Sequence, residues 1–484
     1  DASASSHTTE YNNEGWIFRG LYDYNDKYFA NASFRRDASS KFHPKHRWGN
    51  FWSLGAAWNI SKEDFMESTR GWLNSLKIKA SYGEQGNDNI GNFLYTNTYS
   101  LANVAGNAAA VPATMGNENI SWEKGGNFNA GFEFSMFNNR FSGSFDGFYR
   151  KTTDMLMFFT LPTSFGFTGY YRNVGDMMNA GIELELSGIA VQTHDFTWTV
   201  NFNMTWYKNR ITYLDPETKQ GKAYKGDFEN GKIAEGYGGY GSGSYFYGEG
   251  LPMYTYYNQK YAGVDPESGQ ALYWTYKKYT EADAAAGNIP EGMEIGDPTG
   301  EMTTTTNYGA ADRFAIGTCL APVYGGLSTT FEYKGFDLSV NANYQIGGKV
   351  YDSSYASLMG SPYSSGGKGT NIHADILNSW TPTNTTTDIP RYFYGDQYNT
   401  QQSTRFLTDA SYFSIENINF GYTLPASVSR KLFLQKLRVY FACENVWVWS
   451  KRQGLDPRQS FTGGNSNTYY APVRTISGGL SLTF

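Results

Sequence analysis

Cysteine, charge and long apolar runs are all scarce in this 484-residue chain. Its two cysteines are too few for the disulfide framework of a small secreted domain. Charged residues make up 17% of the sequence, whereas about 25% is usual, and acidic residues outnumber basic ones by 45 to 39. A general nucleic-acid binder would normally be basic, and a helical membrane protein would need runs of about 20 apolar residues, which the sequence lacks. These shortages exclude all three classes, and we expect no nucleic-acid partner.

Glycine and aromatic residues are abundant instead. The chain holds 54 glycines, 39 tyrosines, 33 phenylalanines and 12 tryptophans. So many rings are atypical of a disordered chain, which cannot bury enough apolar surface to fold. Residues 1–14 are polar and have neither the basic nor the apolar region of a signal peptide, so we expect them to be the end of a loop. The composition favours a large β protein.

Strict alternation of apolar and polar residues is the strongest pattern. In 196–206, for example, Phe196, Trp198 and Val200 alternate with threonine and asparagine. A period of two predicts β-strands with one apolar face, and a change of phase near Glu416 predicts a β-bulge. Thirteen segments show the pattern: 15–24, 27–36, 50–60, 73–83, 127–135, 140–149, 180–188, 196–206, 323–333, 336–347, 411–424, 436–449 and 472–484.

The length and polar face of these segments favour a transmembrane antiparallel β-barrel. They run to about 10 residues, which crosses a bilayer when tilted, whereas strands of soluble proteins average about 5–6 residues. Their polar face consists mainly of Asn, Ser, Thr and Gly, which suit a wet lumen. The alternative is a large soluble β-sandwich or propeller.

Short and long connections alternate along the chain. The short ones are Asn25-Asp26, 61–72, 136–139, 189–195, Lys334-Gly335 and 425–435, and the long ones are 37–49, 84–126, 150–179, 207–322, 348–410 and 450–471. Short periplasmic turns and long extracellular loops are typical of outer-membrane barrels, which places Phe484 on the periplasmic side. Connection 207–322 is too long for a plain loop, so we expect hairpins in it, one of them turning at 264–269. These hairpins leave the strand count open between thirteen and fifteen.

The edges of such a sheet need partners. In a bilayer every backbone N–H and C=O group must be paired within the protein, so a spanning sheet has to close. Thirteen to fifteen strands with neither edge protected do not close by themselves. We therefore expect further strands upstream of this sequence.

Several stretches resemble the SusC-like family of TonB-dependent outer-membrane transporters of Bacteroidetes. They run in family order from near residue 24 to the C-terminus, so the resemblance covers nearly the whole chain. The stretches are YNDKYFANASFRRDASSKF (24–42), RWGNFWSLGAAWNIS (47–61), LNSLKIKASYGEQGNDNIG (73–91), NRFSGSFDGFYRKTTDML (139–156), NVGDMMNAGIELELSG (173–188), PVYGGLSTTFEYKGFDLSVNANYQIGG (322–348), DASYFSIENINFGYTLP (409–425), LRVYFACENVWVWSKRQGLDPR (437–458) and the terminal GGLSLTF.

The resemblance implies a 22-stranded barrel with a plugged lumen, of which residues 1–484 would be the C-terminal part. The plug domain, the TonB box and the early strands are not present in the sequence; a separate polypeptide, a cleaved chain or an incomplete sequence could each explain that. The resemblance also implies coupling to TonB-ExbB-ExbD through the missing region. A SusD-like surface lipoprotein would form a lid, SusC–SusD pairs would form dimers, and outer-membrane lipid would surround the barrel.

No group of residues points to catalysis or to a cofactor. His43 and His46 lack a helical spacing and a third ligand for a metal ion. Residues 86–90 lack the EF-hand spacing and predict a turn. No nucleophile–base set and no Walker A run occur. We therefore expect a protein that is not an enzyme and needs no cofactor. Cys443 alternates with apolar residues, so we expect it to face lipid.

Aromatic residues fall into two groups. Rings near strand ends, such as those of Trp58 and Trp447, are expected to form the interfacial girdle. Rings in the long loops lack the strand rhythm, and such rings can stack on sugars while polar neighbours bind hydroxyl groups. Packing against a plug or partner is the alternative interpretation. The candidate substrate-binding residues are Tyr240, Tyr245, Tyr247, Trp274, Tyr355, Tyr363, Arg391, Tyr392 and Tyr394.

Three functions agree with these features. The first is TonB-dependent import of oligosaccharides beneath a SusD-like lid, as the resemblance implies. The second is the same machinery carrying peptides, because the polarity of the wall does not distinguish the two cargoes. The third is a passive pore, adhesin or structural barrel of the outer membrane.

Overall fold

A computed structural model describes residues 8–161, 163–167, 169–360, 371–393, 400–459, 462–465 and 472–484. The chain divides into two compact units. Unit 1 holds residues 1–192 and 199–218, and unit 2 holds residues 193–198 and 219–484. Each unit is described by itself below.

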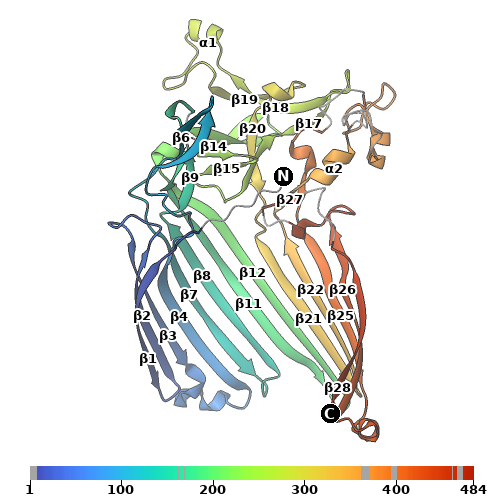
Figure 1. The fold of residues 1–484 in the computed structure, drawn as a ribbon. Helices are drawn as coiled ribbons and strands as arrows, with labels where there is room; N and C mark the ends of the chain where they lie inside the picture. The colour runs from blue at the N-terminus through green and yellow to red at the C-terminus, as the bar shows by residue number, and fades with distance from the viewer. Residues whose placement is uncertain are drawn as a thin grey trace. The chain divides into compact units, whose positions relative to one another are not determined.

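Unit 1 is built on eight long antiparallel strands in simple up-and-down order (Figure 1). Each strand pairs with the next of the eight; β1 and β2, for instance, form twelve residue pairs, and β3 and β4 form seven. The eight strands are β1 (Asn13–Tyr24), β2 (Tyr28–Ser39), β3 (Trp48–Asn59), β4 (Leu73–Asn87), β7 (Glu123–Met136), β8 (Phe141–Thr153), β11 (Gly175–Gln192) and β12 (Phe196–Leu214), whose first three residues belong to unit 2.

Unit 2 contains five more strands of the same kind. They are β21 (Val323–Tyr333), β22 (Phe336–Ile346), β25 (Tyr412–Thr423), β26 (Lys436–Ser450) and β28 (Thr475–Thr483). The thirteen long strands match the thirteen predicted segments one for one. Several are longer than the pattern predicts, β12 reaching Leu214 instead of residue 206, because the strands continue past the alternating stretch into the long connections.

The short connections have the backbone that tight hairpins require. Asn25 and Asp26 have φ of 54° and 51°, and Lys334 and Gly335 have φ of 47° and 90°. Two successive residues with positive φ match the right-handed twist of the flanking strands, and Asn, Asp and Gly tolerate that conformation best. The sequence signals for these two turns are thus confirmed.

The predicted bulge is also confirmed. Asn341 pairs with Asn417, whereas the next residue, Ala342, pairs with Ile415, so Glu416 is the extra residue in β25. An extra residue resets the alternation of faces, which is why the apolar pattern changes phase there.

The longest connection folds into a sheet of its own. Its eight strands, here called the loop sheet, add nothing to the long-stranded sheet of the described residues, so the strand count stays at thirteen. Val264 pairs with Ala271, and the Asp265 N–H donates to the Gln270 carbonyl at 2.9 Å, which confirms the hairpin predicted at 264–269. The strands are β13 (Gly221–Asp227), β14 (Lys232–Ser242), β15 (Tyr245–Gly248), β16 (Thr255–Gln259), β17 (Tyr261–Val264), β18 (Ala271–Lys278), β19 (Pro298–Thr305) and β20 (Arg313–Thr318).

The remaining elements are short. The strands are β5 (Thr98–Val104) with β6 (Asn107–Thr114), β9 (Leu156–Thr160) with β10 (Gly169–Asn173), and β23 (Lys349–Asp352) with β24 (Leu407–Asp409) and β27 (Gly464–Asn465). The α-helices are α1 (Glu281–Ala285), α2 (Ser353–Leu358) and α3 (Ala426–Ser429). The 3-10 helices are η1 (Ile60–Lys62), η2 (Asp64–Thr69), η3 (Thr163–Phe165), η4 (Pro216–Thr218), η5 (Tyr308–Ala310), η6 (Ala374–Asn378), η8 (Thr404–Phe406), η9 (Arg430–Leu432) and η10 (Pro457–Gln459). None of the helices in the described ranges has the length and apolar character needed to cross a bilayer.

One face of the long strands exposes large apolar side chains. Leu54, Tyr82 and Phe128 oppose one another on β3, β4 and β7 and are 54%, 37% and 45% exposed. An apolar row of this kind is costly in water and suits a lipid environment. Cys443 shares the apolar face of β26 with Val439 and Phe441, as expected, but is only 9% exposed, because its short side chain lies between its larger strand partners Ile418 and Ile476.

Candidate functional site

Three of the predicted binding residues meet on one face of the loop sheet. Tyr240 on β14 pairs with Tyr247 on β15, and their rings stack with centroids 5.4 Å apart. Tyr245 lies two residues before Tyr247 and therefore points to the same face. Tyr254 and Tyr256, which were not among the predicted binding residues, join them: their rings lie 5.7 Å and 5.2 Å from that of Tyr245. These five residues are here called the tyrosine face; the alternation of Tyr254 and Tyr256 in the sequence was the signal for the two that were missed.

Two rings of the tyrosine face are tied to the connection that follows β26. The Tyr256 hydroxyl donates to the Gly463 carbonyl at 2.7 Å, and the Tyr245 hydroxyl donates to the Thr462 carbonyl, so the connection after β26 covers these two rings. Tyr240 and Tyr247 are half-buried. Burial, together with the neighbouring Tyr254, raises the pKa of Tyr247 to about 12, so its hydroxyl stays protonated at neutral pH. The part of the Tyr240 and Tyr247 rings that is not buried can offer apolar surface to a ligand.

Trp274 lies in the interior of the loop sheet. Its ring packs 5.7 Å from that of Phe228, against the buried cluster of Tyr276, Met302 and Phe314. These contacts hold Trp274 within the loop sheet itself, whereas the alternative interpretation of the loop aromatics was packing against a plug or partner.

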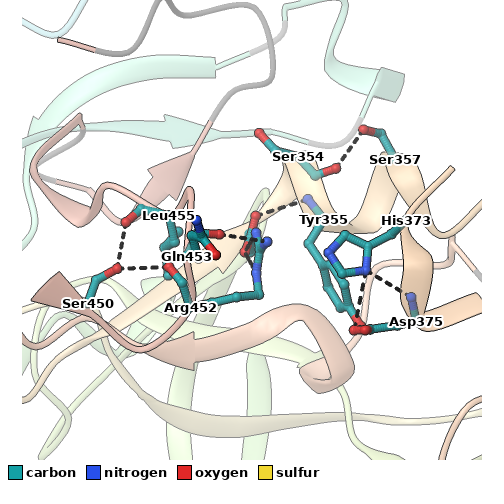
Figure 2. A network of polar contacts seen from close by, with 10 residues as sticks. Ser354, Tyr355, Ser357, His373, Asp375, Ser450, Arg452, Gln453 and Leu455 are labelled. Carbon is teal, nitrogen blue, oxygen red and sulfur yellow. Dashed lines mark hydrogen bonds and ion pairs between the residues drawn. The ribbon is translucent and has the colours of Figure 1, made fainter. Parts of the chain in front are cut away.

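Tyr355 belongs to a polar network that joins two long connections (Figure 2). Its hydroxyl donates to Asp375 at 2.6 Å, and its ring meets that of His373 edge-on at 4.8 Å. The Arg452 guanidinium lies 4.7 Å from the ring centroid. Burial, helped by the Asp375 carboxylate, raises the pKa of Tyr355 to about 12. Tyr355 is thus fixed by protein groups on several sides.

The same network anchors Arg452 to Asp352. The Arg452 Nε donates to Asp352 Oδ2 at 2.8 Å, and its Nη2 donates to the same oxygen. Asp352 Oδ1 accepts the Tyr355 N–H at 3.0 Å and so caps helix α2. The Asp352 side chain is only 3% exposed. A buried carboxylate held by three donors forms a rigid clamp between the connections that follow β22 and β26.

Arg391 and Tyr392 dock their segment onto the loop sheet and onto a small core. The Arg391 N–H and Nη1 donate to the carbonyls of Gly269 and Ser268 at 2.8 Å and 3.0 Å. Tyr392 packs against the cluster that contains Met359. Tyr363 and Tyr394 lie outside the described residues. The structure therefore groups Tyr240, Tyr245 and Tyr247, and it gives Trp274, Tyr355, Arg391 and Tyr392 separate packing positions.

The polar face of unit 1 forms a groove of about 670 Å³. Its lining includes serines, asparagines and four carboxylates, those of Glu133, Asp146, Glu183 and Glu185. The Lys79 ammonium lies 2.7 Å from Glu133 and 3.2 Å from Asp146. The polar face is therefore hydrated and charged, as a lumen wall requires, whereas the opposite face of the same strands is apolar.

The described residues include no group of three His, Cys, Asp or Glu placed to hold a metal ion. The rings of His43 and His46 lie 6.4 Å apart, and that of His43 packs edge-on against Tyr95. The turn predicted at 86–90 is wrong in its first part, because Gly86 and Asn87 still belong to strand β4; the chain bends after them, where the Ile90 N–H donates to the Asp88 carbonyl at 2.7 Å.

Comparisons with known proteins agree with this architecture. Residues 2–289 match the family described as TonB dependent receptor-like, beta-barrel. TonB-dependent receptor P3 of Formosa agariphila is 28% identical over 96% of this chain and 44% of its own length, and TonB-dependent receptor SusC of Bacteroides thetaiotaomicron is 28% identical over 96% and 43%. The solved RagAB peptide transporter superposes with a TM-score of 0.78 at 27% identity, over 98% of this chain and 48% of that one.

The chain thus spans less than half the length of the curated relatives it matches. The match to the family extends over more than half of the chain, and the SusC-like relatives are collinear with almost all of it. The thirteen long strands, apolar on one face and polar on the other, are what this match predicts. The chain therefore belongs to the TonB-dependent receptor β-barrel family of the outer membrane and is of the SusC type.

Proposed function

We propose that the protein containing this chain is a TonB-coupled importer that carries an oligosaccharide across the outer membrane. The observation that supports the choice of cargo is the pair of half-buried rings of Tyr240 and Tyr247, which stack on each other within a sheet of the extracellular loops. Stacked tyrosines offer apolar ring faces to a sugar and hydroxyl groups to its polar rim. In this proposal the cargo passes unchanged, because the relatives of this chain are transporters and receptors.

The partners in this proposal follow from the SusC-type relatives. A SusD-like surface lipoprotein would close over the loop sheet and present the cargo to Tyr240 and Tyr247. TonB-ExbB-ExbD would act through a plug domain supplied by sequence outside this chain, and two such pairs would form a dimer. The charged groove of unit 1, with Lys79 between Glu133 and Asp146, would line the path that opens when the plug moves.

Peptide import is the second candidate, and one observation favours it. The solved structure that covers 98% of this chain at a TM-score of 0.78 is that of a peptide transporter. In addition, Trp274 and Tyr355 are held by packing, so fewer rings are available to sugars than the sequence suggests.

The test compares both cargo classes on the purified complex reconstituted in lipid. Binding of panels of neutral oligosaccharides and of peptides is measured by calorimetry for the parent protein, for Tyr240→Ala with Tyr247→Ala, and for the control Tyr99→Ala, an exposed ring in another loop. Oligosaccharide import predicts sugar binding that the double variant weakens at least tenfold and the control leaves unchanged. Binding of peptides alone would replace the first proposal by the second. Uptake that persists after collapse of the proton gradient would contradict both and favour a passive pore.

A further inference from the structure

The turn between β25 and β26 exposes a cluster of apolar side chains. Val428 is 42% exposed, Leu432 52% and Phe433 92%. Phe433 also has φ of 61°, a left-handed conformation that bulky residues rarely adopt. In water, both the left-handed backbone of Phe433 and the exposure of its ring are unfavourable. The turn is therefore built for surroundings other than bulk water.

Hydrogen bonds hold this turn in its shape. The Phe433 N–H donates to the Arg430 carbonyl at 3.1 Å, and the Leu434 N–H donates to the Ser429 carbonyl at 3.0 Å. Ser429 is fully buried, and its hydroxyl lies 3.4 Å from the Leu424 and Pro425 carbonyl oxygens. The exposed side chains thus project from a closed turn, and their exposure is a property of the fold.

All the charges of this segment are positive. Residues 424–436 contain Arg430, Lys431 and Lys436 and no aspartate or glutamate. The three side chains are exposed, and among the ion pairs of the described residues none involves them. A basic segment with exposed apolar residues is typical of peptides that lie in the interface of an anionic membrane.

The position of the turn in the fold is the one expected for a segment at the membrane surface. It lies at the end of the strands where the short connections are found, because the Gln435 N–H donates to the Thr483 carbonyl at 2.8 Å, next to the C-terminus. The strand that follows continues the apolar surface with Val439 and Phe441, each 45% exposed. The turn is therefore continuous with the lipid-facing surface of β26.

We propose that residues 424–436 form an interfacial anchor, in which Leu432 and Phe433 enter the adjacent lipid leaflet and Arg430, Lys431 and Lys436 bind the phosphates of anionic phospholipids. In the expected orientation this is the periplasmic leaflet. The inference depends on the outer-membrane location of the barrel and is independent of the cargo. A lipid surface fits both the charge and the apolar side chains, whereas a neutral periplasmic protein would satisfy only the latter.

The first experiment measures the depth of Phe433 in the bilayer. The intact transporter is reconstituted in nanodiscs that contain phosphatidylglycerol, and a nitroxide is attached to Phe433→Cys or to the control Ser427→Cys, an exposed position on α3. Cys319 and Cys443 are buried, so labelling of the parent protein gives the background. The label at 433 should collide several-fold more often with oxygen than with a water-soluble nickel chelate, and the label at 427 should do the reverse. Nickel access at 433 equal to that at 427 would overturn the anchor.

The second experiment tests the phosphate contacts. Native mass spectrometry counts the phosphatidylglycerol molecules retained by the parent protein, by Arg430→Gln with Lys431→Gln, and by Lys222→Gln with Lys232→Gln, a pair with the same charge change on the loop sheet. The first pair should retain less than half as many lipids as the parent, and the control pair should retain the same number. Equal retention by all three would overturn the lipid assignment. So would a label at 433 that becomes immobile only when periplasmic protein is added, since the partner would then be a protein.

Discussion

Replacing Arg452 by methionine should loosen the connections that cover the strand ends of unit 2. The change removes two N–H donors from Asp352 Oδ2, and the carboxylate keeps only the Tyr355 N–H (Figure 2). Breaking a buried ion pair costs about 3–5 kcal/mol. The Arg452 side chain is 28% exposed, so water can replace part of the lost hydrogen bonding to Asp352. We therefore expect the free energy of opening of these connections to fall by about 2–3 kcal/mol, which includes the lost contact with the Tyr355 ring.

Hydrogen exchange measures this cost locally. The Tyr351 N–H donates to the Gly463 carbonyl at 2.9 Å, so its exchange reports the opening of the clamp between the two connections. A loss of about 2–3 kcal/mol corresponds to exchange that is faster by about 30- to 150-fold. Combining Arg452→Met with Asp352→Asn should restore most of the protection, because no unpaired buried charge remains. A change below about threefold for Arg452→Met, or a double variant as open as the single one, would refute the buried-charge argument.

Three further predictions concern other parts of the chain. Phe433→Gly relieves a left-handed backbone, worth about 1 kcal/mol, but removes a ring whose place in the apolar phase of lipid or detergent is worth about 2 kcal/mol, so its denaturation midpoint in detergent should fall slightly; a higher midpoint would contradict the anchor. The pKa of Tyr247 is raised to about 12 from an ordinary value near 10, so the stability that its protonated hydroxyl contributes is complete below pH 10 and is lost as the pH rises through 12. Hydrogen exchange at alkaline pH measures this loss as opening of the loop sheet, and the dependence of that opening on pH should be less steep in Tyr247→Phe. Phe202→Arg, on the apolar face of β12, should cost about 2–4 kcal/mol in urea unfolding from lipid vesicles, and Asn203→Ser almost nothing; equal costs would mean that the two faces are assigned wrongly.

The strands could be predicted because their signal is local. Each residue of a strand faces the side opposite to its neighbour, so the alternation in 196–206 marks both the strand and its faces. The bulge at Glu416 and the turn at Asn25 and Asp26 were visible for the same reason, since each depends on a few consecutive residues. The length and polar face of the strands then favoured a membrane barrel, and the family resemblance added the transporter class.

The loop residues could be placed only by the tertiary structure. The Tyr256 hydroxyl meets a carbonyl 207 positions away, and Arg452 meets Asp352 across 100 positions. No periodic pattern encodes such pairs, because they depend on how separate connections fold against one another. The sequence by itself thus determined the thirteen strands, their faces and their tight turns. The fold alone decided that Tyr240 and Tyr247 stack on each other while Trp274 packs against a buried cluster, because the neighbours of a loop side chain are set by segments that are distant in the chain.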